Sequence, residues 1–187
     1  MQHCIDDRIY KINSFHYETY TSLVKTEIEK CYDQYVYKQE FLENKKIKTL
    51  TKEDFLDLAH TLSYLESINF IHGDLNKKNI IFTADGFKII DYEPSLIQNK
   101  YQKKQYMITR PYVSWLDLEV GNITIRTDKL AFYYFILRIN KVMTSKDVVA
   151  LCSTLDHYQY LGMYEDEFAK MSYEDILNKA YQKLYRF

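Results

Sequence analysis

The sequence predicts an α+β fold that consists mostly of helices, and three observations lead to this prediction. Glycine (4 residues) and proline (2 residues) are scarce among the 187 residues, which favours helices joined by short loops. Apolar side chains recur at helical spacing in residues 51–69, and residues 127–139 are apolar on nearly all sides, as in a buried helix. The turn Ala84-Asp85-Gly86 separates two short apolar runs, which is typical of a β-hairpin. The length suits one domain, or one large lobe with a small appendage.

The composition limits the classes of function. Apolar residues (47%) and charged residues (27%) occur in globular proportions, so we expect a packed core. A net charge of −1 argues against a broad nucleic-acid surface or a surface for anionic membranes. No apolar run is long enough to span a membrane, and the first residues lack the apolar core of a signal peptide. The three cysteines lie far apart, which predicts free thiols in the cytoplasm rather than disulfides or zinc.

The first 42 residues are expected to form short strands and one helix. A strand is predicted around residues 9–12, followed by a helix over 16–32 with apolar residues on one face. A second strand is predicted at Tyr35-Val36-Tyr37, and it leads into Glu40-Phe41-Leu42.

The clearest helix begins after Thr51, which is a good N-cap with Asp54 three residues later. It should end near residues 67–69, before a hairpin formed by residues 79–83 and 87–91.

Beyond the hairpin, residues 92–120 lack clean periodicity and are predicted to form a long loop. The following helix, over 127–139, is apolar on nearly all sides, as expected of a central buried helix. Two further helices are predicted, one after Thr144 and one after Ser172, which has Asp175 in the capping position.

Three oxygen-bearing side chains lie on either side of the predicted hairpin. Asp74 and Asn79 are in the loop that enters it, and Asp91 is at its exit. A tight hairpin returns the chain to its start, so the three groups can converge. Carboxylate and amide oxygens suit Mg²⁺ that is held jointly with a substrate phosphate. A further carboxylate nearby can take up the proton of an attacking hydroxyl group.

This stretch resembles the catalytic loop and the metal-binding loop of the protein-kinase-like superfamily. The pattern His-x-Asp-Leu-x-x-x-Asn, then strand, turn, strand and Asp, is matched in order and spacing by residues 71–91. The resemblance implies ATP and Mg²⁺ as cofactors, with Asp74 as catalytic base. It also implies that Asn79 and Asp91 bind the metal and its nucleotide, and that His72 is structural. It extends over residues 8–140 but is specific only for 71–91.

Features downstream agree with the resemblance. The stretch Thr109 to Ser114 is similar to the end of a kinase activation segment, with Glu119 in place of the usual glutamate. Asp128 resembles the aspartate that anchors the catalytic loop; the alternative is a helix-start residue favoured by the helix dipole. Asn76 stands where many kinases have a lysine that contacts the transferred phosphate. Lys77 or Lys78 could replace that lysine, with Lys78 as the catalytic candidate, or both could belong to a solvated turn.

Upstream, the resemblance is thinner. Lys11 is similar to the strand lysine that holds the ATP phosphates, and its partner on the next helix would be Glu29, or else Glu27. The alternative for Lys11 is an ordinary lysine at a strand edge. Glu40-Phe41-Leu42 could form the hinge that meets adenine through backbone groups.

The sequence departs from the family pattern before residue 43. All four glycines lie at residue 73 or later, so a glycine-rich loop is missing. We therefore predict a reduced N-lobe over residues 1–42 and a helical C-lobe over 43–187 that carries the catalytic loop and metal-binding hairpin. Either ATP binds without a lid, a partner chain completes the N-lobe, or catalysis is lost.

A second departure lies after the hairpin. Asp91-Tyr92-Glu93 replaces Asp-Phe-Gly and resembles choline and aminoglycoside kinases.

Taken together, the resemblance implies a minimal protein kinase that transfers the ATP γ-phosphate to a hydroxyl group of a protein substrate. Such chains resemble bacterial effectors, toxin-type kinases or small kinases that work in complexes. The expected location is therefore the cytoplasm, or the cytosol of a host cell for an effector. The alternatives are a small-molecule kinase and a pseudokinase that acts as a binding module. Nucleic-acid and membrane partners are not expected.

Overall fold

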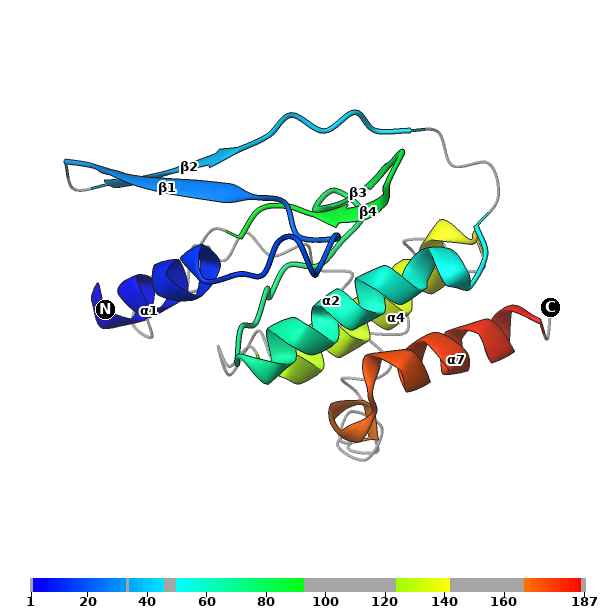
Figure 1. Cartoon of the computed structure of the whole chain (residues 1–187). Helices are drawn as coiled ribbons and strands as arrows, with labels where there is room; N and C mark the ends of the chain where they lie inside the picture. Colours follow the sequence, from blue (N-terminus) through cyan, green and yellow to red (C-terminus); the bar gives the residue numbers. More distant parts are fainter. Residues whose placement is uncertain (1, 33, 46–49, 93–123, 142–166, 186–187) are drawn as a thin grey trace. The chain divides into compact units, whose positions relative to one another are not determined.

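The computed structural model describes residues 2–32, 34–45, 50–92, 124–141 and 167–185 (Figure 1). The chain divides into two compact units, Met1–Phe70 with Asn79–Tyr106, and Ile71–Lys78 with Met107–Phe187. Each unit is considered by itself below, and the predicted lobe boundary at residue 42 stays a prediction. The predicted helix after Thr144 lies outside the described residues, and so does the loop predicted over 92–120 apart from Tyr92.

The first unit begins with a helix, α1 (Gln2–Asn13), so the strand predicted around residues 9–12 is wrong. The sequence contains the reason, because Ile5, Ile9 and Ile12 recur at helical spacing. Lys11 also forms an ion pair with Asp7, one helical turn earlier, at 2.9 Å. Ile12 is fully buried and anchors this helix to the rest of the unit.

The helix predicted over residues 16–32 is also wrong. Its second half is a strand, β1 (Thr26–Cys31), which pairs antiparallel with β2 (Gln34–Gln39). Burial in β1 follows a period of two, with Thr26 buried and Ile28 half-buried between exposed neighbours. The strand predicted at residues 35–37 is confirmed as part of β2.

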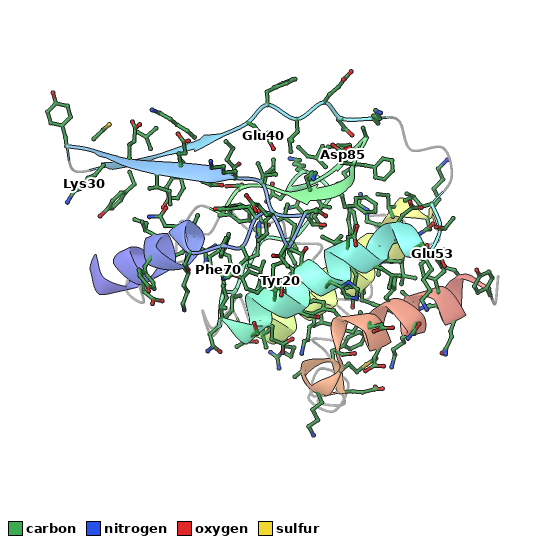
Figure 2. All side chains as sticks on the ribbon, in the orientation of Figure 1. Tyr20, Lys30, Glu40, Glu53, Phe70 and Asp85 are labelled. Atoms are coloured by element: carbon green, nitrogen blue, oxygen red, sulfur yellow. The ribbon has the colours of Figure 1, made fainter. Side chains whose placement is uncertain are left out.

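The two faces of the β1–β2 hairpin differ. Ile28 lies opposite Tyr37 on the half-buried face, and α1 contacts β1. The other face carries Glu29 and Lys38, which form an exposed ion pair at 2.7 Å. Lys30 lies near the tip of this hairpin, and Glu40 lies just beyond its other end (Figure 2).

The helix predicted after Thr51 is confirmed. It consists of a 3₁₀ turn, η1 (Glu53–Phe55), and α2 (Leu56–Ser67). The Asp54 carboxylate accepts hydrogen bonds from the backbone N–H of Thr51 at 2.7 Å and from its hydroxyl at 3.1 Å. The buried face of α2 contains Leu58, Ala59, Thr61, Leu62 and Leu65.

The predicted hairpin is confirmed as β3 (Ile80–Thr83) and β4 (Gly86–Ile89), which pair antiparallel. Gly86 has φ +97°, a conformation that favours glycine, and it ends the turn that carries Asp85 (Figure 2). Phe87 packs against Phe55 with ring centroids 4.9 Å apart, which fixes the hairpin on the start of the α2 segment.

The second unit contains two of the predicted helices, α4 (Ile125–Ile139) and α7 (Tyr173–Leu184). Every residue from Thr127 to Leu137 is buried, as the apolar pattern predicts. Ser172 and Asp175 form the predicted capping box at the start of α7. Phe132 and Tyr173 join the two helices with ring centroids 5.6 Å apart. No helix within the described parts of the chain combines the length and apolarity needed to cross a membrane.

Candidate active site

A buried carboxylate on α4, that of Asp128, holds the start of the loop of residues 71–78. The Asp128 oxygens accept hydrogen bonds from the backbone N–H groups of His72 and Gly73, both at 2.7 Å. Asp128 and His72 are each only 2% exposed, so water competes little with these bonds. Of the two roles considered for Asp128, the geometry supports the loop anchor.

Asn76 shapes the loop from inside. Its side-chain amide donates to the backbone oxygen of Asp74 at 2.9 Å and accepts from the backbone N–H of Lys78 at 2.8 Å. The His72 ring nitrogen Nδ1 accepts from the backbone N–H of Asp74 at 3.3 Å. Sequence reasoning compared Asn76 only with a phosphate-binding lysine and missed this role. Its signal was local, because asparagine commonly accepts a backbone N–H two residues later in a turn.

The other loop residues differ in backbone conformation and in exposure. Gly73 has φ +83°, a left-handed conformation that favours glycine at this position of the loop. The Asp74 side chain is partly exposed, as a group that meets a substrate must be. Lys77 and Lys78 are exposed on the same turn, so a role for Lys78 at a substrate phosphate stays a prediction.

In the first unit, the β3–β4 hairpin brings Asn79 and Asp91 to its open end. Ile80 pairs with Ile89, and the next hydrogen bond runs from the Ile90 N–H to the Asn79 oxygen at 2.9 Å. Asn79 is buried and Asp91, one residue beyond this bond, is exposed. The hairpin register therefore brings the backbones of the two candidates to the same end of the hairpin, and the convergence of their side chains on a metal stays a prediction.

Asp91 has φ +64°, which is unusual for a residue other than glycine and costs about 1–3 kcal/mol unless its surroundings hold it. One partner of Asp91 is Gln39 at the end of β2, whose side-chain oxygen accepts the Asp91 N–H at 3.5 Å. This contact joins the segment that carries the candidate metal ligand Asp91 to the β1–β2 hairpin, and the sequence gives no indication of it.

Tyr92, the residue after Asp91, is held by hydrogen bonds of its side chain and its backbone. Its hydroxyl donates to the Ile89 oxygen at 2.7 Å and accepts the Val24 N–H at 3.0 Å. The backbone oxygen of Tyr92 accepts from Arg8 Nε of α1 at 2.9 Å, while that guanidinium lies 4.2 Å from the Phe70 ring centre. Burial raises the pKa of the Tyr92 phenol far above its ordinary value, so the group stays protonated and can donate.

The structure gives Lys11 and Glu29 partners other than each other. Lys11 lies on a helix rather than a strand; its ammonium contacts Asp7 at 2.9 Å and the Asn69 backbone oxygen at 3.2 Å. Glu29 lies on a strand rather than a helix and pairs with Lys38. The predicted strand lysine and helix glutamate are therefore wrong as structural assignments. A role for either residue at the nucleotide stays a prediction.

The predicted hinge and the predicted activation segment are not tested by the structure. Residues 40–42 directly follow β2 in an irregular segment, where Phe41 is 95% exposed, and their contact with adenine stays a prediction. The activation-segment residues 109–114 and Glu119 lie outside the described residues.

The donor set at the open end of the hairpin fits Mg²⁺. Asn79 offers an amide oxygen and Asp91 a carboxylate, which are hard ligands of the type that Mg²⁺ prefers. Within the described ranges, no group of three or more His, Cys, Asp or Glu residues could hold a metal. A site with two protein ligands suits Mg²⁺ because this ion usually retains water and substrate phosphate oxygens.

An anchored His-x-Asp loop, followed by a hairpin with Asn and Asp at its open end, defines a protein-kinase-like domain. In a comparison with protein families, the model for protein tyrosine and serine/threonine kinases matches residues 17–176. The match covers most of the chain, so the chain belongs to the protein tyrosine and serine/threonine kinase family. The comparison with curated proteins gives no match. The sequence motif and the family match both support an α+β kinase-like fold and, in general terms, a kinase.

Proposed function

We propose that this chain is an active kinase that transfers the γ-phosphate of ATP to a hydroxyl group of a protein. The observation that carries the proposal is the anchored loop that presents Asp74. Asp128 holds its backbone through two buried hydrogen bonds, and Asn76 closes it from inside. A backbone fixed in this way suits a loop that must position a reacting group.

The catalytic roles follow from the chemistry of each side chain. Asp74 orients the acceptor hydroxyl and takes up its proton as the oxygen attacks. Asn79 and Asp91 would hold Mg²⁺ together with the nucleotide phosphates. Bound ATP with Mg²⁺ supplies the phosphoryl group and neutralises its charge. The exposed ammonium of Lys78, four residues after Asp74, supplies a further positive charge for the transferred phosphate.

A protein substrate is the favoured acceptor because the matching family consists of kinases that act on tyrosine, serine and threonine. Nothing before Gly73 in the sequence can form a glycine-rich lid, which favours completion of the nucleotide site by a partner chain. The same feature favours a second candidate function, a kinase-like binding module that has lost catalysis.

The test is transfer of radiolabelled phosphate from ATP in cell extract, with binding of Mg²⁺ and nucleotide measured in parallel. Asp74→Ala should reduce transfer by about 10²–10⁴-fold while nucleotide binding remains. Asp91→Ala should abolish both transfer and Mg²⁺-dependent binding. Asp85→Ala is the matched control, because it removes an exposed carboxylate at the turn of the same hairpin.

Each outcome separates the candidate functions. Transfer to proteins that depends on Asp74 and Asp91 supports the protein kinase. Transfer to sugars or aminoglycosides alone would identify a small-molecule kinase, and nucleotide binding without transfer would identify a binding module. Full activity of Asp91→Ala would overturn the role given to that residue.

A further inference from the structure

A closed series of hydrogen bonds surrounds the segment that carries Asp91. From Asp91, the N–H donates to Gln39 Oε1 at 3.5 Å, and Gln39 Nε2 donates to Thr26 Oγ1 at 2.7 Å. The Thr26 hydroxyl then donates to the Val24 oxygen at 3.0 Å. Val24 and Tyr92 complete the series, as described above, and Tyr92 directly follows Asp91 in the chain.

Gln39 is the member of this series that contacts Asp91 from another element. It uses both ends of its amide, since the oxygen accepts from Asp91 and the nitrogen donates to Thr26. Gln39 also lies opposite Thr26 in the β1–β2 register, so the strand pairing fixes both side chains on one face. Few other side chains combine a donor and an acceptor at this length.

The structure assigns Gln39 the role of a positioning residue for the metal-binding Asp91. The side chain touches neither nucleotide nor metal in this role; it holds the Asp91 backbone in its left-handed conformation. The inference rests on the proposed function for the part that concerns Mg²⁺. The contact of 3.5 Å is long, so we expect Gln39 to act with Tyr92 rather than alone.

Loss of the Gln39 side chain should therefore weaken Mg²⁺-dependent nucleotide binding without abolishing it. Removing one such hydrogen bond is expected to lower Mg²⁺-dependent nucleotide affinity about fivefold, which corresponds to about 1 kcal/mol. Binding measured without Mg²⁺ should not change, because the residue acts only through Asp91. A merely structural role would alter both measurements together.

The experiment compares Gln39→Met, which has similar length but neither polar atom, with Thr26→Val and the wild type. Lys38→Met is the matched control, since Lys38 lies on the same strand and pairs with Glu29 on the opposite face. Titration calorimetry measures nucleotide affinity with and without Mg²⁺. Amide hydrogen exchange of residues 89–92 reports the segment itself, with no dependence on nucleotide.

We expect faster exchange at residues 89–92 and fivefold weaker Mg²⁺-dependent binding in Gln39→Met, with Thr26→Val changing both in the same direction. Lys38→Met should match the wild type. Unchanged exchange in Gln39→Met would overturn the inference. A wild-type chain without Mg²⁺-dependent binding would overturn the proposed function, while faster exchange in Gln39→Met would still support the positioning role.

Discussion

Replacement of Asp128 by asparagine tests the contact that anchors the candidate catalytic loop. The wild-type carboxylate uses both oxygens, one for the N–H of His72 and one for the N–H of Gly73. Asparagine keeps one acceptor and directs an NH₂ group at the other N–H. One charge-assisted hydrogen bond is lost, and two donors then face each other in a buried place.

The magnitude follows from these two bonds. A hydrogen bond to a charged group contributes about 1.5–3 kcal/mol, so Asp128→Asn should lower the free energy of unfolding by about 2–3 kcal/mol. Asp128→Ala removes both acceptors and should cost about 3–5 kcal/mol. A typical domain unfolds with about 5–15 kcal/mol, so the asparagine variant should remain folded at 25 °C. Displacement of the loop by about 1 Å should reduce phosphate transfer about 10²-fold.

Urea denaturation measures the first effect, and transfer at saturating ATP measures the second. Asp175→Asn is the control, because it changes an exposed capping carboxylate of α7 in the same unit. Wild-type stability and activity in Asp128→Asn would refute the anchor. Lower stability with unchanged activity per folded molecule would show that Asp128 supports α4 but does not position Asp74.

Two further predictions concern stability. Tyr92→Phe removes a buried hydroxyl that serves two backbone partners and should cost about 2 kcal/mol, measured by urea denaturation. Because burial raises the Tyr92 pKa, the folded state keeps a proton that the unfolded state loses above its ordinary pKa of 10.0. Stability should therefore fall with rising alkaline pH by up to about 1.4 kcal/mol per pH unit, and Tyr92→Phe should fall less steeply; equal slopes would contradict this reasoning. Ser172→Ala removes the N-cap of α7 and should cost about 1 kcal/mol, whereas an unchanged midpoint of thermal unfolding would show that the cap contributes little.

The elements that could be predicted from the sequence are those with strong local signals. The helix after Thr51 and the helix after Ser172 each carry a cap and an apolar stripe, and the hairpin carries its glycine turn. The first 32 residues gave weaker signals. In β1, one half-buried face is too short a pattern to outweigh helical spacing, and the pairing with β2 decides the conformation.

The candidate site divides in the same way. Asp74, Asn79 and Asp91 could be proposed as site residues because one short stretch of sequence carries their order and spacing. Gln39 could not be found, because its contact with Asp91 depends on the tertiary placement of two hairpins. Asn76 is intermediate: its turn chemistry is local, but its place in the kinase pattern points to the transferred phosphate instead.

Residues 21–23, which lie between α1 and β1, contact β4 at successive positions just before the candidate metal ligand Asp91. Lys88 donates to the Thr21 oxygen, and the Ile89 N–H donates to the Ser22 oxygen. Leu23 forms a parallel β-bridge with Ile89. The irregular chain between α1 and β1 therefore pairs with the end of β4.

Together with the contacts of Arg8, Val24 and Gln39, these bonds cover residues 88–92 along their length. A left-handed aspartate next to a buried tyrosine needs such support, because its conformation is costly on its own. We therefore infer that the chain between α1 and the end of β2 stabilises residues 88–92, the segment that carries the candidate metal ligand Asp91.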